Sequence, residues 1–147
     1  MIRIAIGSDH RGYFLKGKLK NFLRSNKVPA IDVGTHSPKS CDYPLFAKRV
    51  AHLVSQARVD YGILICKTGI GSAIAANKIK NIRAALCYNI KAARFSRQHN
   101  NANILVLGSD FVSEDRAKRI VQEWLSTNFG GGRHERRLKQ ITNIEEE

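Results

Sequence analysis

Short apolar runs alternate with amphipathic segments along the chain, and this alternation restricts the fold more than any other feature. Five runs rich in β-branched or aliphatic residues are typical of strands, at 2–7, 30–34, 62–66, 83–87 and 103–108. Amphipathic helices are predicted between and after them, at 12–26, 44–57, 70–79, 89–98 and 114–127. Such an order predicts an α/β fold with a five-stranded, mainly parallel sheet and helices on both faces.

Helix-start signals support this assignment. Asp42 is a plausible N-cap, with Pro44 in the following turn, and Ser113 is placed as the cap of the fifth helix. Three glycines in "FGGGRHERRLKQ" then interrupt the chain before a C-terminal helical segment. The 147 residues contain no internal repeat or low-complexity segment, so we expect a single domain spanning 1–147.

The charge favours anionic partners. Lysine and arginine total 25 against 12 acidic residues, a formal net charge of +13 that suits either nucleic acid or phosphorylated metabolites. Four of the basic residues form one stripe on the helix predicted at 12–26, and we expect this stripe to be a solvated face. These residues are Lys16, Lys20, Arg24 and Lys27.

The compartment and the metal content follow from what the sequence lacks. No apolar run is long enough to cross a bilayer, and "MIRIAIGSDH" has no export signal, so we expect a cytoplasmic protein without membrane contact. Cys41, Cys66 and Cys87 are odd in number and lack CxxC spacing. We therefore expect neither disulfides nor a metal site.

Polar residues follow the first and third predicted strands. "GSDHRG" places Asp9 and His10 at the carboxyl end of the first, and "CKTGIGS" ends the third. Ligands bind outside the carboxyl ends of parallel strands, where the winding direction reverses. For both loops to meet, strands one and three must be neighbours, with strand two outside strand one.

The glycine turn after Cys66 fits neither common phosphate motif. "TGIGSA" lacks the lysine of a P-loop and the third glycine of a dinucleotide fingerprint. It instead predicts outward-facing backbone N–H groups at a helix start, which favour negative charge and a thiolate. Cys66 could also be a small core residue, as we expect of Cys87, and Thr68 only a turn residue. The adjacent acid and imidazole favour a reaction site, although Asp9 as a helix cap and His10 as a structural histidine stay open.

A second set of polar residues follows the fourth helix. His99 and Asn100 in "SRQHNNAN" precede the fifth strand and therefore lie at the amino edge of the sheet. They form either a helix-ending turn or part of a neighbouring subunit's site. Arg133 and Arg137, one helical turn apart, suit either a phosphate clamp or a solvated basic segment.

Several motifs together resemble the ribose-5-phosphate isomerase B family, within the wider group of galactose-6-phosphate isomerase subunits. They are "IAIGSDHRGYFLK", "DVGTHSP", "GILICKTGIGSAIAANK", "IRAALC", "RQHNNAN" and "GGRHERR", and they occur in order over essentially the whole chain. The resemblance implies a Rossmann-like three-layer subunit and a homodimer that pairs in some members into a tetramer. It also implies no metal or organic cofactor, and interconversion of ribose 5-phosphate and ribulose 5-phosphate.

The resemblance also implies roles for individual residues. Cys66 matches the base that moves a proton between C2 and C1, and Thr68 the hydroxyl beside it. Asp9 and His99 match the residues that open the furanose ring, with His99 coming from the partner subunit. The substrate-binding set comprises His10, Tyr43, the turn Gly69, Ile70 and Gly71, and Asn100, Arg133 and Arg137.

Two positions depart from the family pattern. Lys67 stands where glycine is usual, and Asp110 stands where many members have arginine. An acidic residue near a phosphate pocket repels the ligand, whereas Lys67 adds charge of the right sign. A hexose 6-phosphate, of allose or galactose, stays an alternative substrate because its reacting end is chemically identical. A basic nucleic-acid-binding protein and an inactive relative are the remaining alternatives, although no nucleic-acid recognition motif is present.

Overall fold

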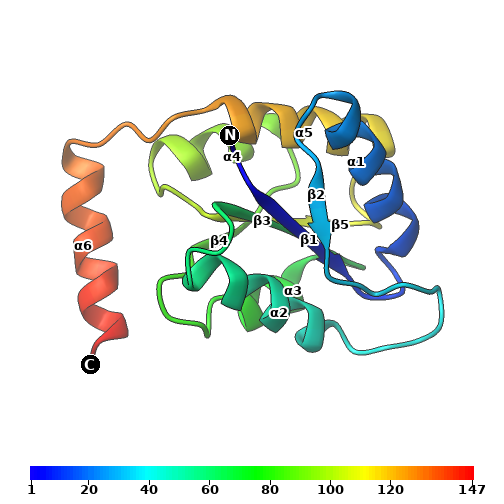
Figure 1. The fold of residues 1–147 in the computed structure, drawn as a ribbon. Helices are drawn as coiled ribbons and strands as arrows, with labels where there is room; N and C mark the ends of the chain where they lie inside the picture. Colours follow the sequence, from blue (N-terminus) through cyan, green and yellow to red (C-terminus); the bar gives the residue numbers. More distant parts are fainter.

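The computed structural model describes residues 1–147 and has one five-stranded parallel sheet in the order β2-β1-β3-β5-β4 (Figure 1). Its strands are β1 (Ile4–Ser8), β2 (Ala30–Asp32), β3 (Tyr61–Cys66), β4 (Ala84–Leu86) and β5 (Ile104–Gly108). The predicted topology is confirmed, because β1 and β3 are neighbours and β2 lies outside β1. The winding direction therefore reverses between β1 and β3.

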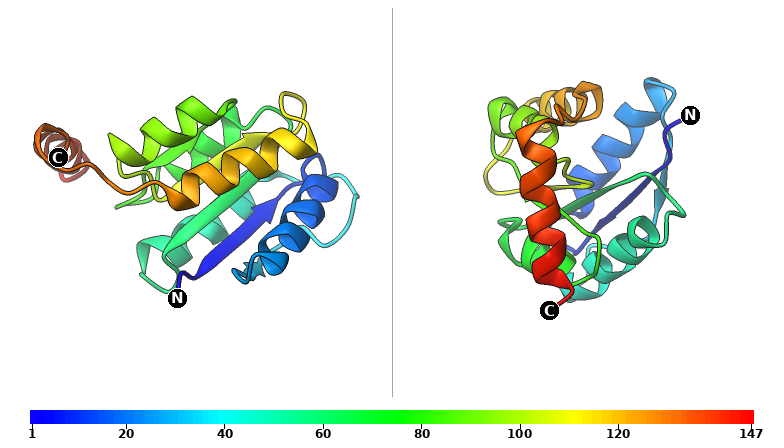
Figure 2. Two further views of the ribbon diagram at one scale, coloured as in Figure 1. Left: turned by 90° about the horizontal axis from the view of Figure 1, so that it is seen from above. Right: turned by 90° about the vertical axis from the view of Figure 1, so that its left-hand side faces the viewer.

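Helices cover both faces of this sheet, which confirms the three-layer architecture (Figures 1 and 2). One face carries α1 (Tyr13–Ser25), α4 (Ile90–Gln98) and α5 (Glu114–Ser126), and the other carries α2 (Tyr43–Ser55) and α3 (Ile70–Ala76). The C-terminal helix α6 (Arg133–Glu145) stands apart from the layers and buries none of its own residues. The expected helix at 70–79 is shorter than predicted, since it ends at Ala76.

The core is split in two by the sheet. Ile6 and Ile63 pack toward α1 and α5, whereas Ala5 and Leu64 pack toward α2 and α3, as the alternation of side chains along a strand requires. Each fully buried isoleucine or leucine contributes about 1.5 to 3 kcal/mol of hydrophobic stabilisation. This two-sided burial holds the strands rigidly enough to support a site at their ends.

The predicted helix starts are correct in position but not in every contact. Ser113 caps α5 and accepts a hydrogen bond from the N–H of Arg116 at 3.1 Å. Asp42 occupies the N-cap of α2, yet its side chain makes no capping hydrogen bond, and Pro44 lies in the first turn. The fixed φ of proline therefore supports the start of α2 without help from the carboxylate.

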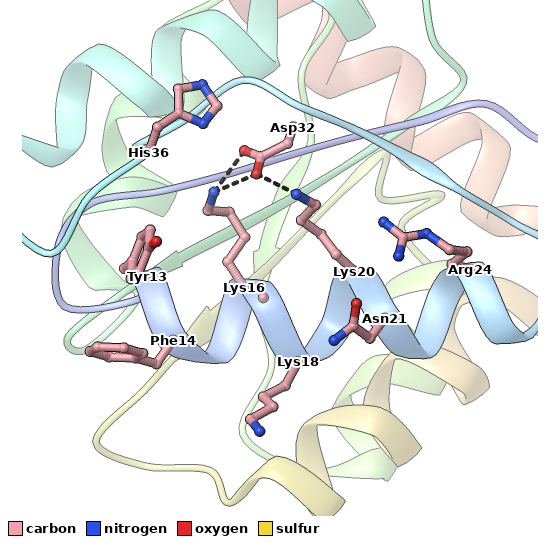
Figure 3. Close-up of a pocket in the computed structure, with 10 residues that line it drawn as sticks. Tyr13, Phe14, Lys16, Lys18, Lys20, Asn21, Arg24, Asp32 and His36 are labelled. Atoms are coloured by element: carbon pink, nitrogen blue, oxygen red, sulfur yellow. Dashed lines mark hydrogen bonds and ion pairs between the residues drawn. The ribbon is translucent and has the colours of Figure 1, made fainter.

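The basic stripe of α1 is not a solvated face, so that prediction is wrong for half of its residues (Figure 3). Arg24 and Lys27 are exposed, but the Lys16 side chain is only 3% exposed. Its Nζ donates to both carboxylate oxygens of Asp32 at 2.7 Å and to the carbonyl of Thr35 at 2.8 Å. Lys20 donates to the same carboxylate at 2.8 Å.

This ion cluster joins α1 to the end of β2. Burial of Asp32 alone raises the pKa of its carboxyl, but hydrogen bonds from Lys16, Lys20 and the N–H of Gly34 outweigh it and lower the pKa to about 2. The carboxylate therefore stays charged across the physiological range. Lys16 uses all three of its N–H donors within the protein, so it has none left for a ligand.

We predict that Lys16→Met destabilises the fold by about 2 to 4 kcal/mol, because it leaves a half-buried carboxylate with only one cationic partner. Lys18→Met, on the exposed side of the same helix, changes the free energy of unfolding by less than about 0.5 kcal/mol. Urea unfolding followed by circular dichroism measures both variants. Equal stability of the two would contradict a structural role for the cluster.

The stability difference between wild type and Lys16→Met should depend on pH. Because the folded pKa of Asp32 lies at about 2, below its ordinary value of 3.8, its contribution to stability is complete above about pH 4 and is lost as the pH falls through 2. The difference between wild type and Lys16→Met should therefore shrink between pH 4 and pH 2. A difference that stays constant over this range would place its origin in packing instead.

Candidate active site

Eight of the predicted site residues gather at the carboxyl edge of the sheet. Ser8 pairs with Ile65, so the loops that follow β1 and β3 leave the sheet side by side. The residues in these loops and at the start of the neighbouring helix α2 are Asp9, His10, Tyr43, Cys66, Thr68, Gly69, Ile70 and Gly71. The two loops therefore meet at the switch point, as the sequence predicts.

Cys66 is the last residue of β3 and is buried, with 4% of its surface exposed. The N–H of Gly69 donates to its Sγ at 3.3 Å, and the hydroxyl of Thr68 accepts from the N–H of Ile70 at 3.1 Å. Gly69 has a φ of +81°, in the left-handed region, and a side chain here would also meet Leu107 and Leu86. Only glycine allows the turn to bring an N–H group onto the sulfur.

The turn does not offer all three of its N–H groups to a ligand. Those of Gly69 and Ile70 are already directed at Cys66 and Thr68. The N–H of Gly71 makes no hydrogen bond within the chain and is the one free donor of the three. The sequence predicts several outward-facing N–H groups in this turn, but only that of Gly71 is left free for a ligand.

Asp9 and His10 are both held in fixed orientations. The buried Asp9 accepts from the N–H groups of Arg11 at 2.9 Å and Gly12 at 3.2 Å, in a turn that precedes α1, so it is not the helix cap. The Nδ1 of His10 accepts from the N–H of Cys41 at 3.2 Å. In the neutral ring, the proton is then on Nε2. No sequence signal identified Cys41 as a neighbour of this histidine.

Tyr43 begins α2 and covers the glycine turn. A side chain at Gly71 would overlap the phenol ring, which places the ring directly against this backbone. The residue is 39% exposed, so part of it is accessible to a ligand above the turn. The α2 layer thereby supplies one wall of the site.

The two unusual residues, Lys67 and Asp110, interact with each other. Asp110 lies 3.7 Å from a guanidinium nitrogen of Arg11 and 4.0 Å from the Nζ of Lys67. Exposed pairs of this kind contribute only about 0 to 1 kcal/mol to stability. Their main effect is therefore on the local charge around the site. The negative charge of Asp110 is compensated by two cations, one of which, Arg11, the sequence reasoning missed.

The other four predicted residues lie elsewhere on the subunit. His99 is the C-cap that follows α4, and its ring lies between two others. The ring centroids are 4.7 Å from Phe95 and 4.4 Å from His134 of α6. Partial burial lowers the pKa of His134, and the nearby charges of His99 and of two arginines lower it further. This second group comprises His99, Asn100, Arg133 and Arg137.

The sheet keeps the two groups apart within one chain. Ile104, the first residue of β5, pairs with Gly62, whereas Cys66 pairs with Gly108. At roughly 3.3 Å per residue this separates the edges by about 13 Å, and His99 lies still further from Cys66. One chain therefore places the two groups of predicted residues at opposite edges of the sheet, as the sequence predicts.

The remaining cysteines and acidic residues suggest no further chemistry. All three cysteines are free, and no group of three or more His, Cys, Asp or Glu residues is arranged to hold a metal ion. Cys87 is a core residue, as predicted, and burial raises the pKa of its thiol to about 11 despite a hydrogen bond with Ser96. Cys66 is the thiol with a glycine turn and an acid beside it.

Known proteins match this chain over nearly its full length. Ribose-5-phosphate isomerase B of Escherichia coli strain K12 is 47% identical over 146 residues, covering 99% of this chain and 98% of that protein. The solved ribose-5-phosphate isomerase B of Clostridium thermocellum superposes with a TM-score of 0.98 at 50% identity, covering 99% of this chain and 98% of that one.

A further solved relative carries a ligand. Ribose-5-phosphate isomerase B of Mycoplasma genitalium with bound ribulose-5-phosphate gives a TM-score of 0.96 at 42% identity, covering 99% of this chain and 97% of that one. Residues 4–141 match the Ribose/Galactose Isomerase family. With this family match and relatives 42% to 50% identical over nearly the full length, the chain belongs to the Ribose/Galactose Isomerase family.

Proposed function

We propose that this protein is an aldose–ketose isomerase that interconverts ribose 5-phosphate and ribulose 5-phosphate. A relative that matches over nearly its whole length is named ribose-5-phosphate isomerase B. Another was solved with ribulose-5-phosphate bound. The single observation that carries the proposal in this chain is the N–H of Gly69 directed at the sulfur of a buried cysteine, beside the fixed carboxylate of Asp9.

Cys66 is the base in this proposal. The reaction removes a proton from C2 of the open-chain aldose and returns one to C1, through an enediolate. The N–H of Gly69, 3.3 Å from the sulfur, holds it in place and is a suitable donor to the thiolate that this proposal requires. The free N–H of Gly71 is then available to the developing oxyanion, and such a donor contributes about 3 to 4 kcal/mol.

The remaining residues open the sugar ring and bind its polar groups. We assign ring opening to Asp9 and to His99 of a second subunit, with the Thr68 hydroxyl beside the reacting carbons. We assign binding of the substrate's phosphate group to His10 and to two arginines of a second subunit, Arg133 and Arg137. Tyr43 and Asn100 complete the sugar pocket.

A homodimer is required by this assignment, and apolar surface supports it. Ile70 and Ile74 lie one turn apart on α3, next to the Cys66 turn, and are 50% and 58% exposed. On α6, Ile141 and Ile144 border a cavity of about 500 Å³ against the β4 edge. Apolar surface beside a polar site is typical of a protein–protein interface, and we propose that a second copy covers it.

We place the reaction in the cytoplasm. All three cysteines are free thiols, as is usual in a reducing compartment. No helix in the chain combines the length and apolar character needed to span a bilayer. A phosphorylated sugar is the partner, and no specific nucleic acid is proposed.

We predict that Cys66→Ala abolishes isomerisation while substrate binding changes little, because a base acts on the transition state. Turnover of ribose 5-phosphate and allose 6-phosphate, measured side by side, together with calorimetric binding, tests this. Cys87→Ala is the control, since that thiol is buried in the core. Near-normal turnover in Cys66→Ala would refute the mechanism, and faster turnover of allose 6-phosphate by wild type would change the substrate.

The shared site makes a second prediction. Mixing Cys66→Ala with His99→Asn chains and allowing subunit exchange should restore activity, because in a mixed dimer one site collects both defects and the other collects neither. Each mixed dimer then has up to half of the native activity. Chains with separable tags confirm the exchange. Complete exchange without recovery, or a fully active monomer, would contradict a two-subunit site.

A further inference from the structure

Three consecutive carbonyl groups around the proposed base are each held by a hydrogen bond. The carbonyl of Cys66 accepts from the N–H of Ser109 at 2.9 Å, and that of Lys67 accepts from the N–H of Asp110 at 3.0 Å. Both donors belong to the backbone of the loop after β5. The third carbonyl, that of Thr68, accepts from the phenolic hydroxyl of Tyr88 at 2.9 Å. Only this third bond depends on a side chain.

The Thr68 carbonyl has little room to move. On one side, Gly108 approaches so closely that a side chain there would overlap the Thr68 carbonyl. On the other side, the Tyr88 ring stacks on Phe111, with centroids 5.0 Å apart and ring planes 26° apart. The tyrosine is partly buried in this arrangement. Its hydroxyl is therefore presented to the carbonyl in a fixed direction.

The direction of this carbonyl determines the hydrogen bond to the sulfur. The C=O of Thr68 and the N–H of Gly69 belong to one planar peptide unit and point in opposite directions. Tyr88 holds the oxygen of this unit, and the opposite N–H points at Cys66 Sγ, 3.3 Å away. Because Gly69 carries no side chain, its backbone conformation is only weakly restrained without such an anchor.

We propose that Tyr88 is a positioning residue for Cys66. It fixes the plane of the Thr68–Gly69 peptide so that the Gly69 N–H stays directed at the sulfur. It acts through the backbone and need not contact the sugar. The inference rests on the proposed role of Cys66 as the base.

Tyr88→Phe tests this inference because it keeps the ring and its stacking and removes only the hydroxyl. We expect kcat for ribose 5-phosphate at neutral pH to fall about tenfold, with KM within about twofold, since a small misplacement of a catalytic group lowers the rate without changing binding.

Ser55→Ala is the matched control, since Ser55 also donates a hydroxyl to a backbone carbonyl, that of Lys80 at 2.7 Å, away from the carboxyl edge. It should change neither kcat nor KM. Equal kinetics of Tyr88→Phe and wild type would overturn the inference, as would a rise of KM with kcat unchanged. Failure of the proposed function is distinguishable, because wild type itself would then be inactive or Cys66→Ala would keep its turnover.

Discussion

The pairing of β3 with its two parallel neighbours is the constraint on which the site depends. In register, Ser8 lies beside Ile65 and Cys66 lies beside Gly108, so three chain segments leave the sheet at the same level. The loop after β5 then donates two backbone hydrogen bonds to the strand end that carries Cys66. Since these bonds are made by backbone groups, the position of the sulfur depends on strand register more than on any neighbouring side chain. The hydrophobic core on both faces of the sheet keeps that register.

The high positive charge is explained partly by the fold. Lys16 is committed to Asp32, and the buried Arg97 donates to Asn101, to the carbonyl of Ala102 and to the Tyr61 hydroxyl. Such cations hold elements together and are unavailable to an external polyanion. The α1 stripe is also interrupted by the burial of Lys16, which makes it a poor nucleic-acid track. The remaining surface cations raise the local concentration of small anions such as sugar phosphates, but they do not select one anion over another.

The sequence predicts those features that depend on local pattern. Strand and helix periodicity identified the five strands and the first five helices, and three glycines marked the start of the C-terminal one. Polar residues at two strand ends predicted the switch point. It could not predict pairs formed between distant residues. Asp32 is 16 residues from Lys16 and on another element, and Tyr88 reaches Thr68 across 20 residues. Helical periodicity assigns a lysine to solvent from its face of the helix alone. It therefore assigned Lys16 to solvent, although the half-buried carboxylate of Asp32 lies opposite.

The two groups of predicted site residues are organised differently. The carboxyl-edge group is fixed by backbone hydrogen bonds at strand ends, whereas His99 is held in a stack with two aromatic rings and lies close to a helix that buries nothing of its own. In the proposed dimer, α6 gains a partner for its apolar side chains, and its arginines are positioned by the same contact. In that dimer, the free energy of association would also order the arginines that we propose to bind phosphate. Activity would then be coupled to subunit contacts outside the reacting residues, such as those of the exposed Ile74 on α3.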